Sequence, residues 1–243
     1  MLIDVHTHIT DKAFDKDRDN VVKRSQCKII IENGLSISNN REVLALADKY
    51  DNVYASLGLY PGEIVMMDEK DIEKEIDWIK SQNFVAIGEI GLDKTYPEFE
   101  KQQKYFKKLV QLAISKKIPV LVHSRKAEKE VIEILEELNA KKVLMHCFSG
   151  KLKLAERIEK NGWYFSIPPV IVHSTHFQEM IKRVSITKLL TETDAPYLGP
   201  DKEQRNEPKN VIFVIRKIAE IKGMDEKEVE NSIYMNYQHL FRK

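Results

Sequence analysis

Short apolar segments alternate with longer amphipathic segments from one end of this chain to the other. Eight of the apolar segments are short and mostly rich in β-branched or aromatic residues, which is typical of strands that are buried on both faces. We therefore predict eight strands, at residues 2–5, 28–32, 53–57, 84–87, 119–122, 142–145, 163–167 and 188–191.

Helical patterns separate these predicted strands. One of them covers residues 98–117, where Phe106, Leu109, Val110 and Ala113 are spaced as on one helical face. Further helices are predicted at residues 41–50, 126–139, 152–161, 177–184 and 208–222. A final helix is expected at 225–241, because Asp225 and Glu228 have the spacing of a capping box.

The alternation of strands and helices predicts βαβ units and therefore an α/β protein with a parallel sheet. Eight such units favour closure into a (β/α)8 TIM barrel, with an extra C-terminal helix after the eighth unit. The length of 243 residues is close to the roughly 250 that are typical of this barrel. No composition shift or linker interrupts the sequence, so residues 1–243 are expected to form a single domain. Periodicity alone leaves an open, doubly wound sheet as the alternative.

Composition narrows the possible partners and the compartment. The formal net charge is +1, so there is no global basic field that would hold nucleic acid, and a polyanionic substrate would need local positive charge. Cys27 and Cys147 do not form a CxxC pair, which fits a reducing compartment. Neither a signal peptide nor a membrane span is evident. We expect a cytoplasmic protein with no membrane contact and no obligate protein partner.

Four histidines occur where predicted strands end. His6 and His8 form an HxH pair at the end of the first strand, where alternate side chains point the same way and both imidazoles can face one metal. His123 directly follows the strand at 119–122, and His146 follows the strand at 142–145. A single histidine at a strand end is more often a packed residue than a ligand, so the argument depends on the whole set.

Two carboxylates complete this set. Glu89 ends the fourth predicted strand, and Asp194 ends the eighth. Barrel enzymes carry their active sites at the C-terminal ends of the strands, so all six side chains are expected to converge on one mouth. Four imidazoles and two carboxylates suffice for two divalent metals with a carboxylate between them, and paired metals activate a bridging water. Histidine-rich ligation suits Zn, Mn, Ni or Co, whereas nuclease chemistry often uses Mg.

Ordered motifs give the chain a family resemblance from its first residue to the terminal helix. It resembles the TatD family of metal-dependent deoxyribonucleases, within the amidohydrolase-like barrels. The motifs are DVHTH at 4–8, GEIGLD at 88–93, VHSR at 122–125, HCFSG at 146–150, TETDAP at 191–196 and RNEP at 205–208. The resemblance implies that the metal ligands are His6, His8, Glu89, His123, His146 and Asp194. It also implies that Glu89 bridges the metals and that Asp194 accepts a proton from the attacking water.

Three further residues are candidates for substrate contacts. The family commonly carries a histidine after the third strand, and Tyr60 holds that place here, so a contact to the phosphate or leaving group is altered. Tyrosine donates a hydrogen bond but is not a cation at neutral pH. Arg125 directly follows the fifth-strand ligand and can contact a phosphate in bidentate fashion, and Arg205 lies in the loop after the eighth strand.

The leading interpretation is a metal-dependent hydrolase of ester bonds, namely a phosphodiesterase or deoxyribonuclease that acts on DNA or a small phosphodiester through a two-metal-activated water. An amidohydrolase that acts on a small cyclic amide, lactone or base is the alternative. Glu89 disfavours it, because many such enzymes have a carboxylated lysine on the fourth strand. A non-enzymatic binding protein with structural metals is a third reading. The ligand set is larger than the closed, four-coordinate site typical of structural zinc.

Overall fold

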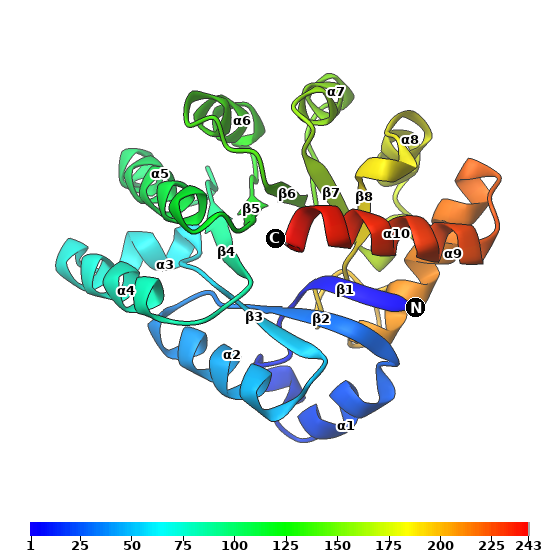
Figure 1. Cartoon of the computed structure of the whole chain (residues 1–243), viewed down its shortest axis with the longest axis horizontal. Coiled ribbons are helices and arrows are strands. Elements are labelled where there is room, and N and C mark those ends of the chain that lie inside the picture. The colour runs from blue at the N-terminus through cyan, green and yellow to red at the C-terminus, as the bar shows by residue number, and fades with distance from the viewer. Residues whose placement is uncertain (243) are drawn as a thin grey trace.

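The computed structural model describes residues 1–242, which form an eight-stranded parallel sheet surrounded by helices (Figure 1). Neighbouring strands pair in chain order from the first strand to the eighth. The strands are β1 (Leu2–Thr7), β2 (Cys27–Asn33), β3 (Val53–Leu57), β4 (Ala86–Gly91), β5 (Val120–His123), β6 (Val143–His146), β7 (Tyr164–Ile167) and β8 (Leu189–Thr191). All eight predicted strands are therefore confirmed, with ends that differ by a few residues.

The sheet curves into a nearly closed barrel, because β1 and the end of β8 lie against each other. The backbone N–H of Asp194 donates to the carbonyl of His6 over 2.9 Å, and that of His8 donates to the carbonyl of Ala195 over 2.8 Å. The Thr191 hydroxyl also donates to the carbonyl of Ile3. These bonds join the first strand to the last one, so the predicted (β/α)8 barrel is confirmed and the open, doubly wound sheet is wrong.

Most of the helices surround the barrel, as Figure 1 shows. The predicted helices are confirmed, although most of their ends shift by one to four residues. The full set is α1 (Arg18–Arg24), α2 (Ile37–Lys49), α3 (Pro61–Met66), α4 (Glu69–Ser81), α5 (Phe99–Lys116), α6 (Glu128–Glu137), α7 (Leu152–Lys160), α8 (Thr175–Arg183), α9 (Val211–Lys222) and α10 (Glu226–Phe241). Short 3-10 turns add η1 (Lys12–Phe14), η2 (Pro169–Val172), η3 (Ile186–Lys188) and η4 (Pro208–Asn210).

Helices α1, α3 and α4 were not predicted from the sequence. The longest of them, α4, buries Ile72, Ile76 and Ile79, which recur at helical spacing within a segment dominated by Lys, Glu and Asp. That narrow apolar face was the available signal for this helix. The segment predicted as one helix at 208–222 consists of the 3-10 turn η4 followed by helix α9.

The extra C-terminal helix is confirmed, and it packs on the barrel end opposite to the mouth. Asp225 caps α10 in a capping box with Glu228, as predicted. Asn236 of α10 donates to the backbone carbonyls of Ile186 and Leu189, where β8 begins, over 2.8 and 2.7 Å. The C-terminal ends of the strands are thus left for the site.

The interior is mostly apolar. Residues such as Ile3, Val5, Ile31 and Leu57 are completely buried in the main core cluster. Buried polar side chains gather toward the C-terminal ends of the strands, and they include Asp4 and Asn33.

Among residues 1–242, no helix combines the length and the apolarity that a membrane crossing requires.

Candidate metal centre

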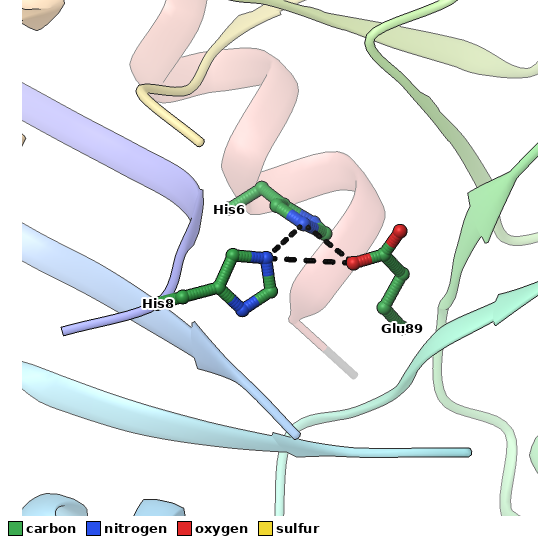
Figure 2. A group of neighbouring side chains, drawn as sticks. All are labelled: His6, His8 and Glu89. Atoms are coloured by element: carbon green, nitrogen blue, oxygen red, sulfur yellow. Dashed lines mark hydrogen bonds and ion pairs between the residues drawn. The ribbon is translucent and has the colours of Figure 1, made fainter. Parts of the chain in front are cut away.

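The first half of the predicted centre consists of His6, His8 and Glu89, which point toward one another in Figure 2. His6 belongs to β1, His8 follows its last residue, and Glu89 comes from β4. The Nε2 atoms of His6 and His8 lie 3.2 and 3.4 Å from Oε2 of Glu89. The two imidazole Nε2 atoms are 3.2 Å apart. Residues from opposite sides of the barrel therefore converge on one carboxylate oxygen.

The second half approaches the other oxygen of the same carboxylate. His123 Nδ1 lies 3.0 Å from Oε1 of Glu89, and His146 Nε2 lies 3.9 Å from it. Asp194 is on the side of the first half, with Oδ1 at 3.4 Å from His8 Nε2 and at 3.7 Å from His6 Nε2. All six predicted side chains are brought together, and each oxygen of Glu89 faces a different pair of histidines.

The hydrogen bonds of two histidines fit a cation. His8 Nδ1 lies 3.1 Å from the carbonyl of Asn33, which can only accept, so Nδ1 carries the proton. His146 Nδ1 lies 2.8 Å from Oε2 of Glu192, which accepts in the same way. A proton on Nδ1 leaves the lone pair of a neutral imidazole on Nε2, and both Nε2 atoms face the centre. The sets His6–His8–Glu89 and Glu89–His123–His146 each place their donor atoms within 4.8 Å of one another, and each can bind a metal ion.

Electrostatics keep the two carboxylates charged. Burial by itself would raise the pKa of Glu89, but hydrogen bonds from His123 and His6 outweigh burial and hold the pKa well below its usual range. Burial also opposes ionisation of Asp194, yet the hydrogen bond from His8 and the nearby imidazole of His146 lower its pKa. Both residues are therefore carboxylates at neutral pH, which is the form that binds metal and accepts a proton.

The imidazoles respond to the same charges in opposite directions. Burial lowers the pKa of His6, and the positive charge of His146 adds to this effect. Burial also disfavours charge on His146, but Glu192 outweighs it and raises the pKa of His146 to about 9. Because the pKa of His146 is raised, a metal ion that binds to its ring would have to displace a proton.

Two buried carboxylates that orient the histidines were missing from the predicted set. Asp93 is fully buried, and its Oδ2 lies 3.1 Å from His123 Nε2. Glu192 is also fully buried and accepts from His146 Nδ1, from the Ser166 hydroxyl and from the backbone N–H of Cys147. Both lie within the recognised motifs, at the ends of GEIGLD and near the start of TETDAP. Their position next to strand-end ligands was the signal that could have identified them.

The loop that carries Asp194 is fixed from two directions. Asp194 has φ of 54°, in the left-handed region that a residue other than glycine seldom adopts. On one side, Asp4 accepts from the Thr193 backbone N–H over 2.9 Å and from the Thr193 hydroxyl over 2.5 Å. On the other side, Asn206 donates to the carbonyls of Thr193 and Tyr197 over 2.8 and 2.6 Å. This bracing holds the Asp194 carboxylate against the histidines.

Tyr60 lies at the edge of the centre, as expected of a residue that replaces a family histidine. Its hydroxyl donates to Oδ2 of Asp93 over 3.2 Å and lies 3.4 Å from His123 Nε2. Burial and the carboxylates of Glu89 and Asp93 raise the pKa of Tyr60, so the hydroxyl keeps its proton at neutral pH. Its substrate contact stays a prediction.

The two predicted arginines have very different surroundings. Arg125 is exposed just after β5, and no side chain among residues 1–242 forms an ion pair with its guanidinium. Arg205 forms ion pairs with Asp17 at 2.8 Å and with Glu207 at 3.1 Å. Its guanidinium also lies 4.4 Å from the ring centroid of Phe14. Substrate contact by Arg205 stays a prediction, and it requires the guanidinium to share or leave these carboxylates.

Comparisons with known proteins agree with this geometry. The sequence model of the family described as "TatD related DNase" matches residues 3–242. A metal-dependent hydrolase of Methanocaldococcus jannaschii, described as uncharacterized, is 39% identical over 99% of this chain and 97% of its own length. Human deoxyribonuclease TATDN3 is 33% identical over 100% of this chain and 95% of its own length.

A solved structure gives the same result. The crystal structure of YjjV, a TatD homologue from Escherichia coli, superposes with a TM-score of 0.92 at 29% identity, and the match covers 100% of this chain and 98% of that one. Family model, relatives and fold thus coincide over the whole described barrel, and the barrel carries histidine and glutamate clusters that can bind metal. The chain belongs to the TatD-related DNase family and is a metal-dependent hydrolase of that family.

Proposed function

We propose that this protein is a phosphodiesterase that hydrolyses DNA with a water activated between two divalent metal ions. The observation that carries the proposal is the placement of Glu89, whose oxygens face different histidines at 3.2 Å and 3.0 Å. A carboxylate so placed is suited to bridge two ions. We assign six ligands to the pair: His6, His8, Glu89, His123, His146 and Asp194. The donors admit Zn, Mg, Mn, Ni or Co.

Bound metal ions would supply Lewis-acid chemistry here, lowering the pKa of a nearby water and stabilising charge on a phosphoryl oxygen. The chain supplies the remaining functions. Asp194 is an ionised carboxylate directed at the centre, so we assign it as the acceptor of the proton of the attacking water. Asp4, Thr193 and Asn206 hold that carboxylate in place through the backbone around it.

Recognition of the phosphodiester is assigned to the β5 side of the mouth. Arg125 is exposed and free of ion pairs among residues 1–242, so its fork of donors is available to a phosphate. The protonated Tyr60 hydroxyl, next to His123, can donate to a phosphate or leaving-group oxygen once it turns away from Asp93. DNA is proposed as the substrate because relatives such as human TATDN3 are named deoxyribonucleases.

Cleavage of end-labelled single-stranded DNA tests the proposal. Wild type and Asp194→Asn are each loaded with Mg, Mn or Zn in separate reactions. We expect metal-dependent cleavage by the wild type and its loss in the variant, with metal content unchanged or lowered. Met235→Ala on the exposed surface of α10 is the matched control and should cleave like the wild type. A metal-loaded wild type that cleaves neither DNA nor a simple phosphodiester contradicts the proposal.

A panel of cyclic amides and lactones, assayed in parallel, separates phosphodiester hydrolysis from amide hydrolysis at the same centre. The proposal predicts that the phosphodiester is the preferred substrate of this panel. A preference for an amide or a lactone would instead assign the centre to an amidohydrolase.

A further inference from the structure

Two exposed tyrosines lie on loops beside the candidate centre. Tyr96 follows β4 and has 40% of its surface exposed, and Tyr197 follows β8 with 56% exposed. A single exposed aromatic side chain is ordinary on a protein surface, but two that flank a recessed site are placed to contact its ligand. Neither residue is among the metal ligands or the arginine and tyrosine contacts proposed above.

Tyr96 is connected to the centre by a series of ring contacts. The rings of His123 and Tyr60 have centroids 5.0 Å apart, and those of Tyr60 and Tyr96 have centroids 6.0 Å apart in an edge-to-face arrangement. Tyr96 is therefore the outermost ring of a series that begins at a proposed metal ligand. The ring is also supported from below, because a Cβ on Gly62 would lie 2.9 Å from its Cζ atom. Glycine at position 62 allows the ring to lie on the start of α3.

Tyr197 is tied to the opposite side of the centre. Its backbone N–H donates to the carbonyl of Asp194 over 2.8 Å, and its hydroxyl donates to Asp11 over 3.2 Å. Asn206 restrains the same segment, because its side chain donates to the Tyr197 carbonyl over 2.6 Å. The backbone below the Tyr197 ring is thus fixed, while most of the ring is open to solvent.

The topology places these two rings across the mouth from each other. In an eight-stranded barrel with strand order β1 to β8, the strands β4 and β8 are diametrically opposed. The centre lies between them, because Glu89 comes from β4 and Asp194 follows β8. A chain that crosses the mouth along this diameter meets one tyrosine, then the proposed metals, then the other tyrosine.

We infer that Tyr96 and Tyr197 are base-stacking residues, which hold unpaired bases on either side of the phosphate that occupies the centre. The inference rests on the proposed function and specifies its substrate as a nucleic acid strand with unstacked bases. Aromatic rings stack on any base, and this contact is a common means of holding single strands without sequence preference. Bases within a duplex are stacked on each other and leave no face for the two rings. Because Glu89 is only 3% exposed, the phosphate must also enter a recessed site.

Binding of fluorescein-labelled DNA, followed by anisotropy, tests the inference without turnover. All proteins carry Asp194→Asn to prevent cleavage, and two strands are compared: a mixed-sequence strand and one of the same length with abasic residues throughout. Loss of a stacking contact costs about tenfold in affinity. We expect Tyr96→Ala and Tyr197→Ala each to weaken binding of the mixed strand by about that factor and to leave the abasic strand unaffected.

Three controls decide the interpretation. Tyr96→Phe and Tyr197→Phe keep the ring and should bind like the parent, and Met235→Ala on α10 removes an exposed side chain far from the mouth and should do the same. Equal weakening of both strands by the alanine variants, unchanged binding, or no binding by the parent would overturn the inference. Tyrosine-dependent binding of a strand that the metal-loaded wild type does not cleave would instead support the stacking role and contradict the proposed function.

Discussion

The two sides of the metal centre are built by different means. On the β1 and β8 side, backbone hydrogen bonds join His6 and His8 to the Asp194 loop, at 2.9 and 2.8 Å. On the β4 and β5 side, His123 is held by side chains instead, by Asp93 at 3.1 Å and by Tyr60 at 3.4 Å. The His6 side chain is completely buried, whereas that of His123 is 15% exposed.

This difference indicates a division of roles. The β1 and β8 side is fixed by the same bonds that close the barrel, so it is preorganised for the proposed ligands and the proposed proton acceptor. On the β4 and β5 side, His123 depends on the side chains of Asp93 and Tyr60, which a single substitution can remove. Tyr60, which stands in place of a family histidine, falls on this second side. Substitutions on the two sides should therefore differ in severity, and four of them test this comparison.

The largest effect is expected for Asp194→Asn on the β1 and β8 side. Asparagine keeps the shape but cannot take a proton from water, and removal of a general base costs about 10²–10⁴-fold in rate. We expect a fall in kcat within that range, with stability within about 1 kcal/mol of the wild type because the backbone bonds persist. Single-turnover cleavage of DNA and thermal unfolding measure the two quantities. A variant with near-normal kcat would remove Asp194 from the role assigned to it.

A smaller effect is expected for Asp93→Asn on the β4 and β5 side. Partners that orient a metal-binding histidine typically contribute 10–100-fold to metal affinity or activity, and Asp93 orients His123. Titration with Zn or Mn should show that one ion binds with lower affinity and that the other binds as in the wild type. If the affinity for both ions falls equally, the two sides are not independent and the comparison fails.

Acid should weaken the ion pairs of Glu207, the residue that follows Asn206 in the chain. Ion pairs with Arg24 and Arg205 lower the pKa of Glu207 to about 2 from an ordinary 4.5. A depressed carboxyl pKa contributes stability that is present above pH 4.5 and is lost as the pH falls through about 2. Glu207→Gln should therefore cost about 1–2 kcal/mol at pH 7 and progressively less below pH 4.5. Urea unfolding at several pH values measures this, and a cost that is independent of pH would contradict the assignment.

The smallest effect is expected for Tyr60→Phe. Loss of one hydroxyl that donates to Asp93 removes a hydrogen bond worth about 1 kcal/mol, which corresponds to roughly fivefold in kcat/KM. Tyr60→His restores the family residue and should retain at least the wild-type rate. Steady-state kinetics on DNA compares the three proteins, and a loss in Tyr60→Phe as large as that in Asp194→Asn would refute the division of roles.

The sequence allowed the prediction of the strands and of the residues at their ends. His6, His8, Glu89 and His123 were found because a parallel barrel brings every strand end to one mouth, so local position implies proximity. Arg205 could not be interpreted in this way. Its partner Asp17 is 188 residues away along the chain, so no local sequence pattern predicts that ion pair.

Other features were missed for different physical reasons. Asp93 and Glu192 act by orienting histidines, and the residue type alone does not separate a ligand from the partner of a ligand. Helix α4 was missed because its apolar face is narrow within a highly charged segment. The stacking tyrosines were identified only once the strand order placed β4 opposite β8.

The number of metal ions per chain tests the central claim most directly. The claim is that Glu89 joins two ligand sets, so that one ion binds on each side of its carboxylate. Metal analysis of Zn- or Mn-loaded wild type should give two ions per chain, and the double variant His123→Ala, His146→Ala should retain one, held by His6, His8 and Asp194. A wild type that saturates with a single ion, or a double variant that loses all metal while it stays folded, would contradict the account.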